Sequence, residues 1–268
     1  MFQGGTLSIP LHKQIDNLLF LCYNDFKKGS DRMQKNVADV FARVLKEKNE
    51  AKIKLLGDSI THGVGGTGWK QSGDIIVEGW ADSPDGYSWA NLLRDHMKEK
   101  YGATVVNKAC TGTNIGFIIQ HFSELVDSDD DLIVCTIGTN DRHQYFRSGE
   151  KPDKENFLKE LYGRIKVMYD MFKNTGIPTI FVANIPASEK NERDGAEYWR
   201  ILHMSDINES YKKLARECGA SVLSLYDLFS DYCRENNACV DEFLCDGLHP
   251  NDKGYKLIFD LLVTAFEI

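Results

Sequence analysis

Short apolar runs and helix-spaced apolar residues alternate along the chain from residue 52 onward. The short runs predict strands, and they lie at residues 52–56, 103–106, 132–137, 179–184 and 221–225. The amphipathic segments predict helices, and they lie at residues 88–100, 115–122, 154–173, 205–218 and 251–266. Strands that alternate with helices form a parallel sheet covered by helices on both faces. The pattern therefore predicts an α/β fold, a three-layer α/β/α sandwich around a five-stranded parallel sheet.

The first fifty residues follow a different pattern. Ser30 and Asp31 are suited to cap a helix. Apolar residues then recur at helical spacing: Met33, Val37, Val40, Phe41, Val44 and Leu45. We expect residues 1–50 to form a helical extension packed on a main domain of residues 51–268. A lid over the site is the alternative role for this helix.

Length and charge narrow the classes of partner. A chain of 268 residues is long enough for one large domain with a substantial core. Its formal net charge of −8 disfavours nucleic acids and anionic membrane surfaces as partners. The best apolar run near the start, residues 15–22, is too short to span a bilayer and contains Asp16. Residues 1–10 lack the features of a secretory signal, so we expect a cytoplasmic protein, with a removed signal as the alternative. The oligomeric state is not readable from the sequence.

The seven cysteines contain no CxxC pair. Three lie in or beside apolar runs and are expected in the core: Cys22, Cys110 and Cys135. Three others are spaced by six residues and precede His249: Cys233, Cys239 and Cys245. A zinc site or a disulfide is the alternative reading of that set, but the spacing matches no common zinc pattern. We therefore expect no metal site.

Four polar segments carry the candidate chemistry. Three follow the first three expected strands and one precedes the last helix: residues 57–61, 107–114, 138–141 and 246–250. In open parallel sheets the carboxyl ends of the strands share one edge, where ligands bind. Each segment taken alone is typical of an ordinary turn. Together they supply a nucleophile, a base, an orienting carboxylate and oxyanion donors, which are the parts that acyl transfer needs.

Roles follow from the side chains in these segments. Ser59 is the expected nucleophile and His249 the base, while Asp246, three residues earlier, can accept a hydrogen bond from the imidazole Nδ1–H. Gly112 lets its backbone amide approach a ligand, and the side chain of Asn140 offers an N–H donor. Asp141, the next residue, is suited to orient a neighbour or cap the following segment.

The four segments resemble the four blocks of the GDSL/SGNH hydrolase family, which is named for its Ser, Gly, Asn and His. The similarity runs from about residue 53 to the C-terminus. It implies a flavodoxin-like sandwich and a serine esterase without metal or organic cofactor. The resemblance also implies a triad of Ser59, His249 and Asp246 and an oxyanion hole formed by the amides of Ser59 and Gly112 with the Asn140 side chain. Two residues depart from the family pattern: Ile60 replaces Leu, and Ala109 stands where a further glycine is common.

The substrate class is suggested by the glycine-rich stretch of residues 63–87. Trp69 and Trp80 lie in it, and indole faces stack on sugar rings; packing beneath the loop is the alternative role for them. Asp58 and Arg142 flank the expected site and are further candidates for substrate binding. We expect a small-molecule or glycan ester as substrate, with removal of an acetyl or other short acyl group from a carbohydrate. The alternatives are an acyltransferase with the same triad, a lipid or short-chain ester hydrolase, and a non-catalytic carbohydrate-binding domain.

Overall fold

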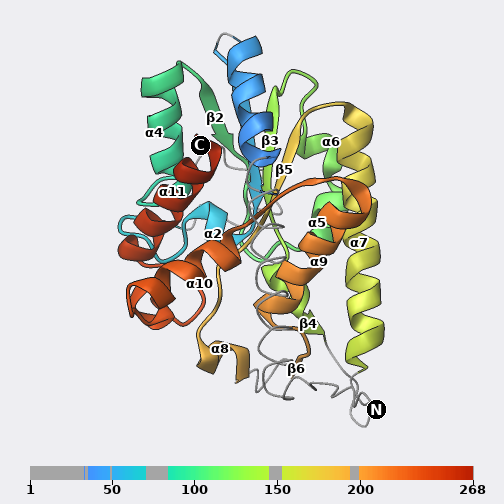
Figure 1. Ribbon diagram of the computed structural model, residues 1–268, viewed down its shortest axis with the longest axis vertical. Coiled ribbons are helices and arrows are strands. Elements are labelled where there is room, and N and C mark those ends of the chain that lie inside the picture. Colours follow the sequence, from blue (N-terminus) through green and yellow to red (C-terminus); the bar gives the residue numbers. More distant parts are fainter. Residues whose placement is uncertain are drawn as a thin grey trace, which may run out of the picture.

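Five parallel strands form the central sheet (Figure 1). The computed structural model describes residues 33, 36–48, 50–70, 84–144, 153–193 and 199–267. The strand order is β2-β1-β3-β5-β7, and all four pairings are parallel. The strands are β1 (Lys52–Gly57), β2 (Thr104–Asn107), β3 (Leu132–Thr136), β5 (Thr179–Ala183) and β7 (Ser221–Ser224). The predicted five-stranded parallel sheet is confirmed.

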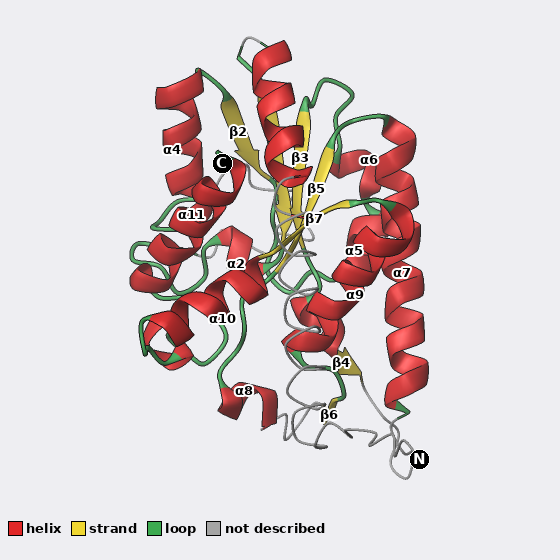
Figure 2. Cartoon of the chain, viewed as in Figure 1, coloured by secondary structure: helices red, strands yellow, loops and turns green. Residues whose placement is uncertain are grey.

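Helices cover both faces of this sheet (Figure 2). One layer contains α4 (Trp89–Tyr101), α10 (Leu225–Glu235) and α11 (Asp252–Phe266). The other contains α5 (Ile115–Gln120), α6 (Phe122–Leu125), α7 (Lys154–Thr175) and α9 (Met204–Cys218). Leu132 and Val134 of β3 join the core on the first side, and Ile133 and Cys135 join the core on the second. Successive strand residues point to opposite faces, so the sheet separates two apolar cores and the predicted three-layer sandwich is confirmed.

The helix ends follow the capping residues of the sequence. Ser88 accepts a hydrogen bond from the Asn91 amide at the start of α4, and Asn251 does the same for Gly254 at the start of α11. Gly102 ends α4 in the left-handed region, at φ 67°. Most boundaries therefore lie within one or two residues of their expected positions.

Two expectations about helices were wrong. The helix expected over residues 115–122 is split at His121 into α5 and α6. No helix was predicted within residues 226–250, where the structure has most of α10 and a 3-10 turn, η2 (Val240–Phe243). The signal for α10 was present, because Ser224 caps the helix and Leu225 and Phe229 recur four residues apart on its buried face.

A helix over residues 36–47 packs against the first layer. Val37, Phe41 and Val44 are buried, and the Phe41 ring stacks on Phe266 with 4.7 Å between centroids. Phe266 ends α11, about 20 Å along the helix axis from its first residue, which follows the His249 turn closely. The described part of this helix thus contacts the end of α11 that lies away from that turn, and the roles predicted for residues 1–50 stay predictions. The division of the chain at residue 51 stays a prediction.

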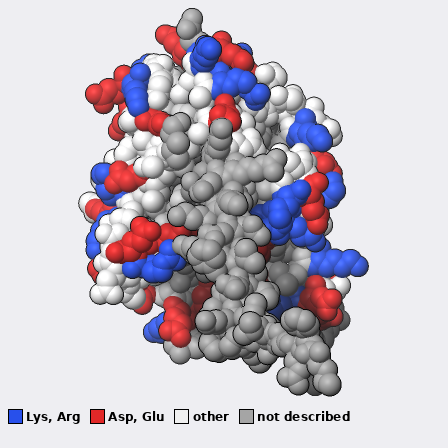
Figure 3. Space-filling view, in the orientation of Figure 1, with Lys and Arg blue, Asp and Glu red and all other residues white. Residues whose placement is uncertain are grey.

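The surface in Figure 3 carries Lys and Arg interspersed with Asp and Glu over the described residues that face the viewer. Neither sign gathers into a broad patch in this view. Within the described ranges, no helix has both the length and the apolar character that crossing a membrane requires.

Candidate active site

The segment after β1 holds Ser59 at the edge of the sheet. Asp58 caps α2 (Ser59–His62) by accepting a hydrogen bond of 3.0 Å from the Ile60 amide. Ser59 is the first residue of this short helix, so its own amide has no partner in a preceding helical turn. A Cβ at Gly57 would lie 2.3 Å from Thr61 Oγ1 and 2.7 Å from the Thr136 oxygen. The tight strand-to-helix turn therefore requires the glycine.

The turn before α11 brings the imidazole to Ser59. His249 Nε2 lies 2.9 Å from Ser59 Oγ, although 190 residues separate the two along the chain. On the other side of the ring, Nδ1 lies 2.7 Å from Asp246 Oδ2. With the Nδ1 proton donated to Asp246, the Nε2 lone pair faces the serine hydroxyl. The three residues predicted as a triad are brought together in the geometry that proton transfer from the serine requires.

The Asp246 carboxylate is fixed by its own turn. Its Oδ1 accepts hydrogen bonds from the amides of Leu248 at 2.9 Å and His249 at 2.8 Å. Partial burial tends to raise the pKa of Asp246, but the hydrogen bonds from the His249 side chain and from these amides outweigh it, so the pKa lies below its ordinary value. The carboxylate therefore stays ionised and holds the imidazole in one orientation.

The loops after β2 and β3 lie on either side of the β1 end, because β2 and β3 are the two neighbours of β1 in the sheet. Thr113 Oγ1 donates a 3.0 Å hydrogen bond to the Gly57 oxygen, which fastens the β2 loop to the segment before Ser59. Gly112 has φ 76°, and no oxygen of the described residues accepts from its amide. Asn140 lies in η1 (Thr139–Arg142) after β3, and its Nδ2 donates to the Thr113 oxygen at 2.7 Å.

A buried carboxylate connects these two loops further. Asp141 Oδ2 accepts a 3.0 Å hydrogen bond from the amide of Ile115, the first residue of α5, and Oδ1 lies 3.7 Å from an Arg164 nitrogen. Burial raises the pKa of Asp141 to about 6, although the Ile115 amide and Arg164 favour its charged form. Asp141 thus accepts from the first amide of the helix that follows the Gly112 loop, while Asn114 is the N-cap of that helix.

Two of the four residues predicted to bind substrate are buried. Asp58 and Arg142 are both 0% exposed, which argues against direct contact with a substrate, and their part in substrate binding stays a prediction. Asp58 serves as the α2 cap, and burial raises its pKa. Arg142 donates from Nε to the Thr139 oxygen at 2.9 Å and from Nη1 to Glu192 at 3.1 Å. Both residues lie beside the expected site in the sequence. In the structure their side chains are buried and hydrogen-bond the backbone next to Ser59 and Asn140.

The remaining two substrate candidates are the tryptophans. Trp69 is half-buried, and its indole N–H donates to His62 Nδ1 at 2.9 Å. His62 is buried in α2, which lowers its pKa and keeps Nδ1 an acceptor. This bond occupies the indole N–H, and a part for Trp69 in substrate binding stays a prediction. Trp80 lies outside the described residues.

The loop that carries Trp69 is fastened to α11 by contacts that sequence analysis missed. Asp252 accepts hydrogen bonds from the Thr67 amide at 2.7 Å and hydroxyl at 2.6 Å, and Tyr255 donates to the Val64 oxygen at 2.7 Å. A Cβ at Gly65 would lie 3.5 Å from the Cβ of His249, so the loop packs directly beside the histidine turn. The partners are more than 180 residues apart, and the sequence carries no local signal for such pairs.

The cysteines do not form the alternative site considered from the sequence. Cys233 is buried, Cys239 and Cys245 are exposed, and all three are free thiols. The core positions expected for Cys110 and Cys135 are confirmed, and Cys22 lies outside the described residues. In the described part of the chain, one group of carboxylates is close enough to share a cation: Asp127, Asp129 and Asp130. The ammonium groups of Lys52 and Lys54 already pair with this group, at 2.6 to 3.5 Å.

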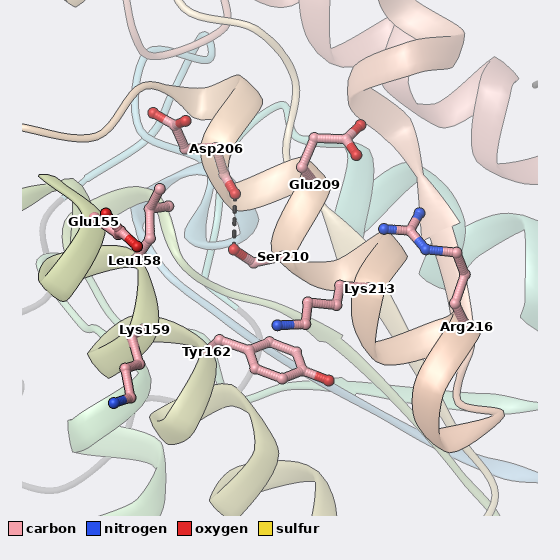
Figure 4. Close-up of a pocket in the computed structure, with 9 residues that line it drawn as sticks. All are labelled: Glu155, Leu158, Lys159, Tyr162, Asp206, Glu209, Ser210, Lys213 and Arg216. Carbon is pink, nitrogen blue, oxygen red and sulfur yellow. Dashed lines mark hydrogen bonds between the residues drawn. The ribbon is translucent and has the colours of Figure 1, made fainter. Parts of the chain in front are cut away.

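A surface groove between α7 and α9 is separate from these segments (Figure 4). It has a volume of about 410 Å³, and its lining residues are Glu155, Leu158, Lys159, Tyr162, Asp206, Glu209, Ser210, Lys213 and Arg216. Lys213 Nζ lies 4.1 Å from the Tyr162 ring centroid, and Ser210 Oγ donates to the Asp206 oxygen at 2.8 Å. None of the lining residues belongs to the four polar segments.

Comparison with protein families gives one match over most of the chain. The model of the GDSL-like lipase/acylhydrolase family matches residues 55–257. A curated relative, an uncharacterized protein of Mycoplasma pneumoniae, is 24% identical over 220 residues. That alignment covers 74% of this chain but only 22% of the relative, so the chain spans about a fifth of its length.

Solved structures share the fold. An acetylxylan esterase of Geobacillus stearothermophilus superposes with a TM-score of 0.58 at 17% identity, covering 82% of this chain and 97% of that one. An α/β-hydrolase enzyme from the metagenome of Lake Arreo, Spain, superposes with a TM-score of 0.54 at 20% identity, covering 81% and 94% of the two chains. At these identities the similarity establishes the fold.

Proposed function

Because the chain belongs to the GDSL-like lipase/acylhydrolase family, a family of carboxylic ester hydrolases, we propose that it removes a short acyl group from a carbohydrate ester by means of Ser59, His249 and Asp246. The observation that carries this proposal is the relay of contacts at the edge of the sheet. Ser59 Oγ lies 2.9 Å from His249 Nε2, and His249 Nδ1 lies 2.7 Å from Asp246 Oδ2. Such a chain of contacts activates a serine for nucleophilic attack.

The first half of the reaction forms an acyl-enzyme. His249 takes the hydroxyl proton as Ser59 Oγ attacks the ester carbonyl, and the carbonyl oxygen becomes an oxyanion. The amides of Ser59 and Gly112 and the second N–H of the Asn140 side chain donate to that oxygen. Protonated His249, paired with Asp246, then gives its proton to the leaving alcohol as the C–O bond breaks.

The second half repeats these steps with water. His249 takes a proton from water as its oxygen attacks the acyl carbonyl, the same donors stabilise the oxyanion, and the proton returns to Ser59 as the free acid leaves. Each preorganised donor is worth about 3 to 4 kcal/mol in a reaction of this type, so the placement of the loops after β2 and β3 contributes directly to the rate.

The substrate class is supported by two observations. The Geobacillus structures with this fold belong to an esterase described as acting on acetylxylan and acetyl-xylooligosaccharides. The triad is supported by the catalytic mutants described for that esterase. They replace a serine, an aspartate and a histidine, and the aspartate and histidine are three positions apart, as Asp246 and His249 are here. The partly exposed indole of Trp69, which is anchored to His62 in the helix that begins at Ser59, offers a face of the kind that packs on sugar rings.

The decisive experiment is Ser59→Ala assayed with a short-chain nitrophenyl ester. We expect turnover to disappear while the circular dichroism spectrum and the melting temperature remain close to those of the wild type. Ser230→Ala is the matched control, because its hydroxyl donates to Tyr226 within α10 and is remote from the site. Full activity in Ser59→Ala, or failure of a fluorophosphonate probe to label Ser59 in the wild type, would disprove the nucleophile assignment.

The substrate is tested separately. We expect the specificity constant kcat/KM for acetylated xylooligosaccharides to exceed that for nitrophenyl esters of long acyl chains. Product analysis with and without an added acceptor alcohol distinguishes a hydrolase, which releases free acid in both cases, from an acyltransferase. A preference for long acyl chains would contradict the carbohydrate assignment and leave the triad intact.

A further inference from the structure

We propose that Asn184 is a positioning residue for this reaction, because it ties the segment that carries Ser59 to the segment that carries Asn140. The inference rests on the function proposed above. Asn184 belongs to none of the four polar segments that the sequence singled out, and it follows β5, which is not adjacent to β1 in the sheet.

The geometry of the Asn184 side chain is specific. Its Nδ2 lies 2.8 Å from Thr139 Oγ1 and 3.2 Å from Asp58 Oδ2. Thr139 directly precedes the predicted oxyanion donor Asn140, and Asp58 directly precedes the predicted nucleophile Ser59. The amide group of Asn184 therefore contacts the residue directly before the predicted nucleophile and the residue directly before the predicted oxyanion donor.

These contacts lie in the interior of the protein. Asn184 is 2% exposed, and Thr139 and Asp58 are each 0% exposed. Thr139 and Asp58 both contact the same nitrogen of Asn184, so the three side chains form one buried group. Water cannot substitute for a lost partner easily at this depth, and hydrogen bonds in a medium of low dielectric constant hold their geometry strongly. Removal of the amide should therefore shift the two segments relative to each other.

The connection that begins at Asn184 contacts the third part of the site as well. The Ser188 amide donates to the Gly247 oxygen at 2.8 Å, within the turn that carries Asp246 and His249. Farther along, Glu192 in α8 (Glu189–Arg193) pairs with Arg142 at 3.1 Å, at the end of η1. The segment after β5 thus contacts the nucleophile, oxyanion and histidine segments, and Asn184 is its first residue.

The test is the kinetics of Asn184→Ala on a short-chain nitrophenyl ester. A displacement of reacting groups by about 1 Å costs about a hundredfold in rate, so we expect kcat to fall by about tenfold to a hundredfold. The Michaelis constant KM should stay within about twofold, because Asn184 does not contact the substrate.

A matched control separates positioning from stability. Asn208 is also 2% exposed; its Nδ2 donates to Asp227 at 2.9 Å and its Oδ1 accepts from Ser224 at 2.7 Å, at the start of α10. Asn208→Ala deletes the same atoms at the same depth, so a similar fall in melting temperature is expected. Its kcat should stay within about twofold of the wild type. Equal kcat values for Asn184→Ala and Asn208→Ala would overturn the proposal.

Thr139 supplies a second route should Asn184→Ala not fold. Thr139→Val keeps the side-chain shape but removes the hydroxyl that Asn184 contacts, so it should lower kcat in the same way. Thr139→Ser keeps the hydroxyl and should retain the wild-type kcat. Wild-type kcat in Thr139→Val would overturn the proposal. Loss of turnover in Ser59→Ala together with normal kcat in Asn184→Ala would disprove this inference alone, whereas retained turnover in Ser59→Ala would disprove the proposed function.

Discussion

The side chain of Asn140 donates a 2.7 Å hydrogen bond to the backbone oxygen of Thr113, and this bond joins the loops that follow β3 and β2. An amide group has two N–H donors, so the contact uses one and fixes the direction of the other. Gly112, the residue before Thr113, carries the second predicted oxyanion donor on its backbone. The two donors are therefore held as a unit, and a change in either loop should affect both.

The first prediction concerns Gly112→Ala, with Gly102→Ala as control. Both glycines have a left-handed conformation, φ 76° and 67°, and an added Cβ would meet no atom within 4 Å at either position. Each substitution should thus cost a similar 1–2 kcal/mol of stability, at about the usual strain for this region. Only Gly112→Ala should lower kcat, because relief of the strain turns its amide. Equal kcat in the two variants would contradict the role of the Gly112 amide; urea unfolding and ester hydrolysis measure the two effects.

The second prediction concerns the carboxylate that orients the imidazole. Asp246→Asn should lower kcat by about a thousandfold to ten-thousandfold, the range typical of such a change in a serine triad. The amide N–H would face His249 Nδ1 and favour the tautomer that points a proton, rather than a lone pair, at Ser59. Asp241→Asn, an equal change of charge at an exposed site nearby, is the control and should retain activity. A small effect at Asp246 would show that the carboxylate is dispensable.

The third prediction tests Trp69 as a sugar platform. Trp69→Ala should raise KM for acetylated xylooligosaccharides by about threefold to tenfold, the value of one aromatic contact. KM for nitrophenyl acetate should change little. Trp69→Phe keeps an aromatic face but loses the hydrogen bond to His62, so it should lie between the wild type and Trp69→Ala. An equal rise in KM for both substrates would mean that Trp69 supports the loop and does not select sugars.

The fourth prediction concerns the pH dependence of stability. Burial raises the pKa of Asp141 to about 6, so the folded state binds this proton more tightly than the unfolded state does. The cost of burying the charge is therefore complete above pH 6 and disappears as the pH falls toward 4. Asp141→Asn should be more stable than the wild type at pH 7.5, by about 2 kcal/mol at most, and the difference should shrink between about pH 6 and pH 4. Urea unfolding at several pH values measures it, and a difference independent of pH would contradict the raised pKa.

The fold was predictable because its signals are local. Apolar runs separated by amphipathic segments predicted the five parallel strands, and capping residues such as Ser88 and Gly102 marked helix ends to within a residue or two. The Asp246–His249 contact was predictable for the same reason, since three residues of a tight turn fix it. Helix α10 was missed although its apolar spacing was readable. Leu225 and Phe229 lie four residues apart, but no element was predicted between residues 226 and 250.

The sequence by itself determined the kinds of elements, their order and the residue types available for the chemistry, since these depend on periodicity and local backbone preference. Only the tertiary structure decided which side chains are covered and which distant segments meet. It buried Asp58 and Arg142, brought His249 to Ser59 across 190 residues, and placed Asn184 between Asp58 and Thr139. The physical reason is that burial and long-range hydrogen bonds depend on the packing of elements remote in the chain, and no local pattern records that packing.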